Sequence, residues 1–159
     1  MKRLWQKIPA FAVILLSVPA FAGRGVTAED YFGFVFIADP HISPDGRQVA
    51  YTLTRIDTAA NRRVSSIWAV PTNGSSEPRQ LSAEGFSSTA PRWSPDGTRL
   101  AFLSNRNPSP AAGGATAAEA PRPQIWILRM DGGEAQQVSR LKNGASAMQW
   151  SPDGNRIVA

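Results

Sequence analysis

The chain has 159 residues, of which 42% are hydrophobic, with 13 Gly, 13 Pro and no Cys. This length allows one modest core but not a large multidomain enzyme, and the absence of Cys excludes disulfides, thiolate metal sites, a Cys nucleophile and a lipobox Cys. The formal charge of +5 comes with no run of Lys and Arg interleaved with aromatics, so the sequence does not favour a nucleic-acid partner.

The first 22 residues have the organisation of an export signal. Lys2, Arg3 and Lys7 form a basic region, residues 8–18 are apolar, and Ala20-Phe21-Ala22 is a small-x-small cleavage site. The apolar stretch is too short and too interrupted by Pro for a permanent membrane span. We therefore expect cleavage near Ala22, export to the periplasm or the medium, and no stable membrane anchor. Removal leaves 17 − 3 = 14 basic against 12 acidic residues, about +2.

Residues 23–34 predict a short lead-in segment. Thr27 is a suitable N-cap residue, and Glu29 and Asp30 would face the positive end of a short helix. Aromatic residues follow at positions 31, 32, 34 and 36, which makes the segment too apolar for an unattached tail. We expect it to cover an exposed edge or seam of the fold that follows.

Three copies of Ser-Pro-Asp-Gly organise the rest of the chain. Pro presets the second position of a type I turn, Asp suits the third, and Gly takes the left-handed conformation that returns the chain into an antiparallel partner. The copies are 51 and 57 residues apart, a spacing typical of solenoids and propellers. Each copy is therefore predicted to be the structural turn at a hairpin tip. The copies are Ser43-Pro44-Asp45-Gly46, Ser94-Pro95-Asp96-Gly97 and Ser151-Pro152-Asp153-Gly154.

The segments around the tips predict an all-β fold of four-stranded antiparallel blades. An apolar strand follows each tip, a third strand carries Ile-Trp at residues 67–68 and 125–126, and the dipeptides Asn73-Gly74 and Asp131-Gly132 then signal a tight turn into a fourth strand. Such a sheet is one blade of a β-propeller, because stacking against neighbours buries both of its faces.

The expected partial propeller spans residues 35–159. Blade 1 covers about 35–82 and blade 2 about 88–140, with a flexible insertion at 107–123 that is rich in Pro, Ala and Gly. Residues 146–159 would form the first hairpin of a third blade. Because a propeller closes with about four to eight blades, we expect the chain to be the front part of a longer protein.

Few residues of the chain are candidates for chemistry. His41, two residues from Asp39, could belong to a metal site, but two ligands are thin support and a first-strand position near the channel is favoured. Ser139 and Lys142 fit a Ser-x-x-Lys pattern, although the Ser would end a strand and the Lys would open a loop. We expect the tip carboxylates to serve their turns, and we expect Arg99 and the matching Arg156 to be solvated strand residues. No catalytic residue, cofactor or metal ligand is expected within this chain.

The order of these elements resembles the N-terminal propeller of prolyl oligopeptidase family serine peptidases, in the acylaminoacyl-peptidase and dipeptidyl-peptidase-like branch. The resemblance rests on the export signal, on the short acidic-aromatic lead-in and on three quoted stretches. These are Asp39-Pro40-His41-Ile42 before the first tip, Pro91-Arg92-Trp93 before the second tip, and Asp131-Gly132-Gly133-Glu134.

The resemblance implies a propeller of about seven blades that restricts access of unstructured peptides to a C-terminal α/β-hydrolase domain with a Ser-Asp-His triad. None of that triad maps onto this sequence, which has no Gly-x-Ser-x-Gly elbow. The first hypothesis is thus a non-catalytic gating propeller of an exported serine peptidase. The alternative is a TolB-like binding or scaffold propeller without hydrolase activity. The short lead-in and the 51- and 57-residue repeats favour the peptidase.

Overall fold

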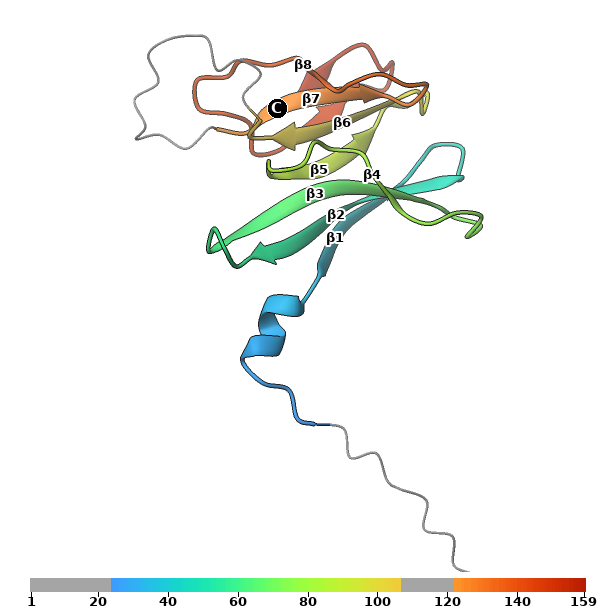
Figure 1. Cartoon of the computed structure of the whole chain (residues 1–159). Helices are drawn as coiled ribbons and strands as arrows, with labels where there is room; N and C mark the ends of the chain where they lie inside the picture. Colours follow the sequence, from blue (N-terminus) through green and yellow to red (C-terminus); the bar gives the residue numbers. More distant parts are fainter. Residues whose placement is uncertain (1–23, 107–121) are drawn as a thin grey trace, which may run out of the picture.

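The computed structural model describes residues 24–106 and 122–159, in which every strand belongs to an antiparallel sheet. The predicted signal peptide and nearly all of the predicted insertion lie outside the described residues. Figure 1 shows two four-stranded sheets stacked on each other, consistent with blades of a partial β-propeller. No helix among the described residues has the length and apolar character needed to cross a membrane.

Each sheet has its strands in chain order, so successive strands pair as hairpins. Blade 1 consists of β1 (Phe36–Ile42), β2 (Gln48–Asp57), β3 (Arg62–Pro71) and β4 (Arg79–Gln80). Blade 2 consists of β5 (Ser88–Trp93), β6 (Arg99–Ser104), β7 (Gln124–Arg129) and β8 (Gln136–Gln137). The third hairpin consists of β9 (Gln149–Trp150) and β10 (Ile157–Val158).

The strands after the tips behave as the sequence predicts, with one difference in length. In β6 the five residues from Leu100 to Ser104 are all buried, because neighbouring sheets cover both faces. The strand predicted after the first tip spans residues 47–54, whereas β2 continues to Asp57, three residues further. It does so because β3 pairs with it over ten residues, from Gln48 opposite Pro71 to Asp57 opposite Arg62.

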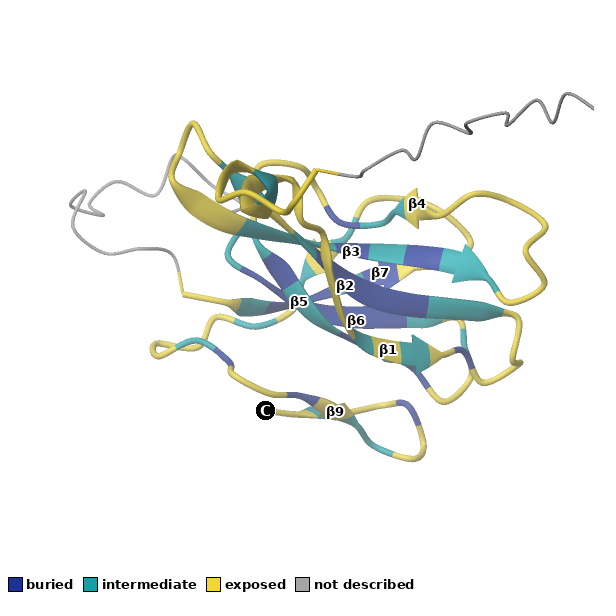
Figure 2. Ribbon diagram, turned by 90° about the horizontal axis from the view of Figure 1, so that it is seen from below, coloured by how far each residue is buried: buried dark blue, intermediate teal, exposed yellow. Residues whose placement is uncertain are grey.

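The hydrophobic core lies between the two blades and extends to the third hairpin. Its buried members include Ala50 and Ile67 from blade 1 and Leu100 and Phe102 from blade 2, while Trp150 of the third hairpin packs against the same cluster. Figure 2 shows the buried residues concentrated on the central strands of both blades. Burial therefore depends on stacking between blades, because one four-stranded sheet alone would leave its faces exposed.

The lead-in segment contains a 3-10 helix, η1 (Glu29–Gly33), and Figure 1 shows it before β1, on the side of blade 1 away from blade 2. The prediction of Thr27 as its N-cap is wrong, because Ala28 holds that position without a side-chain cap. Instead the Asp30 carboxylate accepts the Thr27 N–H at 2.8 Å and pairs with Arg24. The Tyr31 hydroxyl accepts a hydrogen bond from Arg63 Nη2 of β3 at 2.5 Å, which ties the segment to blade 1.

Candidate functional site

The Ser-Pro-Asp-Gly tips are closed by a repeated set of hydrogen bonds. In the second tip the Gly97 N–H donates to the Ser94 carbonyl at 2.9 Å, and Gly97 has φ +71°. The Ser94 hydroxyl donates to Asp96 Oδ1 at 2.5 Å and accepts the Arg99 N–H at 3.0 Å. Asp96 Oδ1 also accepts the Thr98 N–H at 3.0 Å. The other two tips have equivalent bonds, centred on Ser43 with Asp45 and on Ser151 with Asp153.

These hydrogen bonds set the protonation of the tip carboxylates. In each tip the Ser hydroxyl contributes most to lowering the Asp pKa, followed by the backbone N–H two residues on. The pKa of Asp96 falls to about 2. The three carboxylates are therefore ionised acceptors engaged in their own turns, and they do not converge on a common site.

A second repeated contact joins neighbouring blades through the Trp before a tip. The Trp93 indole Nε1–H of blade 2 donates to the His41 carbonyl of blade 1 at 3.0 Å. In the same way the Trp150 indole of the third hairpin donates to the Arg92 carbonyl of blade 2 at 3.0 Å. His41 and Arg92 hold equivalent positions in β1 and β5, so one hydrogen bond is repeated at each interface between blades.

The tips themselves also meet across the blades. A Cβ added at Gly97 would lie 3.5 Å from the Pro44 ring, and one at Gly154 would lie 3.5 Å from the Pro95 ring. Arg99 adds a contact between blade 2 and the third hairpin, because its Nη2 donates to the Gly154 carbonyl at 2.9 Å and its guanidinium lies 4.8 Å from the Trp150 ring. Arg99 is thus a strand residue whose side chain is only partly solvated, at 34% exposed, whereas Arg156 is exposed.

The first strand of each blade contains a bulge beside a proline. The pairing of β1 with β2 shifts between Ala38 and His41, and that of β5 with β6 shifts between Thr89 and Arg92. Both bulges hold a residue at positive φ directly before a Pro, which cannot donate to the ladder. These residues are Asp39 at φ 52° and Ala90 at φ 55°. Neither bulge is predicted by the alternation of side chains along a regular strand.

The bulges bring Asp39, His41 and Arg92 together. Arg92 Nη1 donates to Asp39 Oδ2 at 2.8 Å and to the Pro91 carbonyl at 2.8 Å, and lies 2.7 Å from His41 Nε2. His41 Nε2 lies 2.9 Å from Asp39 Oδ1. His41 Nε2 is thus within hydrogen-bond distance of both the Arg92 guanidinium and the Asp39 carboxylate, and the imidazole tautomer sets which of the two contacts is a hydrogen bond.

The cluster contains an ion pair that joins the two blades. Partial burial acts to raise the pKa of Asp39, but the hydrogen bonds from Arg92 and then His41 outweigh it and the pKa is lowered. The guanidinium occupies the position beside the imidazole and carboxylate that a cation would need. Within residues 24–106 and 122–159, no group of three or more metal-ligating side chains is found.

This polar cluster borders a groove on the first strands, which lie next to one another in space. The groove has a volume of about 470 Å³ and is lined by His41 and Arg92, by Gln149 at the equivalent third position, and by the Trp93 and Trp150 rings. The side chains of Asp39, His41 and Arg92 are 35%, 38% and 30% exposed. The groove therefore presents hydrogen-bonding groups beside aromatic surface.

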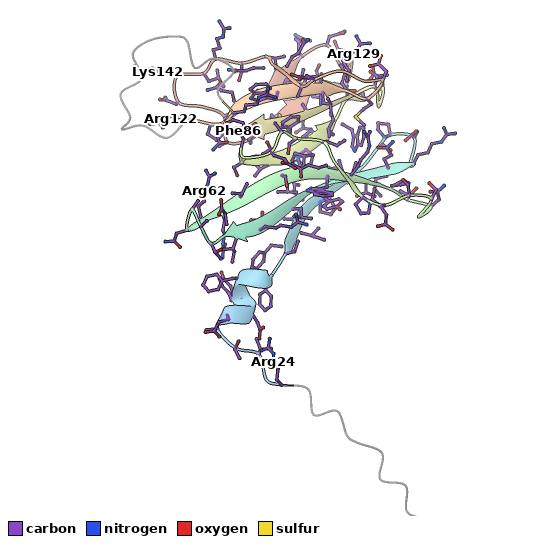
Figure 3. All side chains as sticks on the ribbon, viewed as in Figure 1. Arg24, Arg62, Phe86, Arg122, Arg129 and Lys142 are labelled. Carbon is purple, nitrogen blue, oxygen red and sulfur yellow. The ribbon has the colours of Figure 1, made fainter. Side chains whose placement is uncertain are left out.

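The Ser-x-x-Lys pattern has no catalytic geometry. The Ser139 hydroxyl donates to Gln124 Oε1 at 2.8 Å and accepts the Ile125 N–H at 2.8 Å, so it fixes the end of blade 2. Lys142 is exposed, and Figure 3 shows it on the loop after β8. Within residues 24–106 and 122–159, no hydrogen bond joins this hydroxyl to a basic side chain that could activate it.

Two curated relatives are peptidases by name. The uncharacterized peptidase YuxL of Bacillus subtilis is 35% identical over 134 residues, which cover 84% of this chain and 18% of YuxL. Dipeptidyl-peptidase 5 of Porphyromonas endodontalis is 28% identical over 117 residues, covering 74% of this chain and 15% of the relative. The chain thus spans less than a fifth of the length of these relatives. No family model matches it.

Solved structures agree on the fold. The acylaminoacyl peptidase of Pyrococcus horikoshii superposes with a TM-score of 0.57 at 23% identity, covering 80% of this chain and 17% of the peptidase. The β-propeller domain of the Trilobed protease from Pyrococcus furiosus gives a TM-score of 0.54 at 22% identity, covering 78% and 33%. The solved structures share the fold of these blades, and the curated relatives make the chain similar to part of the prolyl oligopeptidase-like acylaminoacyl and dipeptidyl peptidases, in the portion that forms the propeller.

Proposed function

We propose that this chain is the non-catalytic, substrate-gating propeller portion of an exported serine peptidase that acts on peptides. The observation that carries the proposal is the 35% identity to a peptidase over 84% of the chain. The half-buried Ser139 supports it, because the hydroxyl donates to Gln124 and accepts the Ile125 N–H instead of pairing with a basic side chain among the described residues. Hydrolysis is assigned to an α/β-hydrolase domain with a Ser-Asp-His triad in the complete protein.

Gating follows from the size and chemistry of the channel that such blades would line. First strands that lie side by side surround an axis in a propeller, and the central channel of such a ring would admit an extended peptide but not a folded domain. The groove bordered by Arg92 and His41 offers hydrogen bonds to a passing peptide. Selection would therefore depend on the width and lining of the channel, and bond cleavage on the hydrolase domain.

The complete protein, expressed from its whole coding sequence, tests whether hydrolysis is carried out by a domain other than the propeller portion. A fluorophosphonate probe should label a Ser beyond Ala159, and limited proteolysis should recover residues 23–159 without label. Labelling within residues 23–159, or a complete protein without a reactive Ser, contradicts the proposal.

Gating is tested separately, by comparing the cleavage of substrates of different size. Arg92→Ala should change the ratio of cleavage of long to short peptides while leaving hydrolysis of a small p-nitrophenyl ester unchanged, because the ester does not need the channel lining. The matched control is Arg47→Ala, whose side chain is 85% exposed at a tip and lies outside the groove. Equal effects of Arg92→Ala on ester and peptide would point to a structural role instead.

Export is proposed from the first 22 residues. N-terminal sequencing of protein recovered from the periplasm or medium should begin at Gly23. Replacement of Lys2, Arg3 and Lys7 by Gln should leave the precursor in the cytoplasm, because the basic region orients the signal. A cytoplasmic protein that keeps Met1 in the unaltered chain would contradict export.

A further inference from the structure

The groove along the first strands has a cation in its wall and no carboxylate. Arg92 lines it together with Gln149 and the Trp93 and Trp150 rings. Asp39, whose carboxylate pairs with Arg92 at 2.8 Å, is not among the lining residues, and no Asp or Glu of the described part of the chain is. A ligand that enters the groove therefore meets the guanidinium without a competing negative charge.

The Arg92 guanidinium is held in place through one of its nitrogens. Nη1 donates to Asp39 Oδ2 and to the Pro91 carbonyl, both at 2.8 Å, and lies 2.7 Å from His41 Nε2. Within residues 24–106 and 122–159, Nε and Nη2 have no hydrogen bond. Because Arg carries its N–H donors in a rigid planar fork, the edge formed by Nε and Nη2 is oriented by the contacts of Nη1 and remains for a ligand.

The backbone around Arg92 is strained. Asp39 has φ 52° and Ala90 has φ 55°, and each lies in the bulge of a first strand. These bulges bring Asp39 and Arg92 of two different blades into contact. Backbone held in a sparsely populated conformation is concentrated at ligand-binding sites, because the strain is retained where it positions a functional group. The strain here positions the guanidinium.

A carboxylate is the group that this arrangement fits. The N–H groups of Nε and Nη2 match the two oxygens of one carboxylate bidentately. The indole N–H groups of Trp93 and Trp150 already donate to backbone carbonyls. Their rings therefore offer the groove apolar surface, against which the carbon atoms beside a carboxylate can pack.

We propose that this groove binds the carboxylate of an extended peptide through Arg92, with Asp39 as the residue that positions the guanidinium. The inference rests on the proposed function for the nature of the ligand, and it adds that the propeller portion selects peptides that carry a carboxylate here. An acidic side chain and the C-terminus of the peptide both supply this group, and the experiment distinguishes them.

Equilibrium binding of labelled peptides to the complete protein tests the site. The peptides have Glu or Gln at one central position and a free or amidated C-terminus, and fluorescence anisotropy measures their Kd. Treatment with a fluorophosphonate beforehand keeps the peptides intact. We expect the peptide that carries the recognised carboxylate to bind about tenfold more tightly than its neutral counterpart. A difference between Glu and Gln assigns the site to an acidic side chain, and a difference between the free and the amidated end assigns it to the C-terminus.

Variants within the groove show whether Arg92 is responsible. Arg92→Gln should bring the ratio of the two Kd values close to one. Gln149→Glu should also lower the ratio, because Gln149 is exposed in the same groove and the added negative charge repels a carboxylate without altering the ion pair between blades. Arg47→Gln is the matched control, since Arg47 lies at a tip outside the groove and should leave the ratio unchanged.

Equal affinities for charged and neutral peptides in the unaltered protein would overturn the inference. So would a ratio that Arg92→Gln leaves unchanged, including one in which both affinities fall together, because Arg92 would then have a structural role. If circular dichroism shows that Arg92→Gln does not fold, Gln149→Glu decides by the same criterion. Hydrolysis is measured on untreated protein, so a protein without peptidase activity that keeps the carboxylate preference contradicts the proposed function alone. An active peptidase without that preference contradicts the carboxylate site alone.

Discussion

Ser94→Ala tests whether the burial of a tip increases the contribution of its hydrogen bonds to the stability of the protein. Ser94 is fully buried, and its hydroxyl accepts the Arg99 N–H at 3.0 Å while donating to Asp96 Oδ1 at 2.5 Å. Ser151 makes the same two bonds in the third tip, at 2.9 and 2.5 Å, but in an exposed setting. The two substitutions therefore remove identical hydrogen bonds in different surroundings.

The expected loss follows from the donor left without a partner. Removal of the Ser94 hydroxyl leaves the Arg99 N–H unsatisfied in a half-buried turn, which costs about 1–3 kcal/mol of unfolding free energy. In a protein that consists of these 159 residues alone, the third tip is in contact with water, which replaces the hydroxyl, so Ser151→Ala should cost less than about 1 kcal/mol there. Ser43→Ala should fall between them or close to Ser94→Ala, because Ser43 is 6% exposed.

Urea unfolding followed by far-UV circular dichroism measures these differences, because the midpoint shifts at constant slope when only stability changes. A loss for Ser94→Ala equal to that for Ser151→Ala would refute the reasoning, since it would mean that burial does not affect the contribution of the tip. A changed slope for either variant would show an altered unfolded or native state instead, and the comparison would then use Ser→Gly variants at both sites.

Three further predictions concern the same interfaces. The pKa of Asp96 is lowered from its usual 3.8 to about 2, so the contribution of this carboxylate to stability is complete above about pH 4 and is lost as the pH falls through about 2. Asp96→Asn should therefore flatten the dependence of the urea midpoint on pH between these values, and an unchanged profile contradicts this prediction. Trp93→Phe should lower the free energy of unfolding in urea by about 1–2 kcal/mol more than Trp68→Phe does. The Trp93 indole donates to a neighbouring blade, whereas the Trp68 indole donates to Ser66 of its own strand. Equal losses would disprove a special role for the contact between blades. Gly97→Ala should lower the stability by about 1–2 kcal/mol because Gly97 has a φ of +71°. Gly25→Ala should leave the melting temperature unchanged, because an added Cβ there would have nothing within 4 Å. A neutral Gly97→Ala would contradict the turn geometry.

The local features of the fold could be predicted because short-range chemistry specifies them. The Gly residues of the tips take positive φ and the hairpins form where Pro, Asp and Gly require turns. The burial of Leu100 to Ser104 agrees with an uninterrupted apolar run. The bulges at Asp39 and Ala90 were not predicted, because alternation of side chains assumes regular pairing, and the Pro that follows each residue was the only local signal of a broken ladder.

The amino-acid sequence by itself determined the repeated unit, its antiparallel strands and its tips, since turn formation and side-chain alternation depend on neighbouring residues. Only the tertiary structure decided what joins the units. The ion pair of Arg92 with Asp39 spans 53 positions, the bond of the Trp150 indole to the Arg92 carbonyl spans 58, and Arg99 reaches the Gly154 carbonyl 55 positions away. Such contacts depend on how one sheet stacks on the next, which no local pattern of residues encodes.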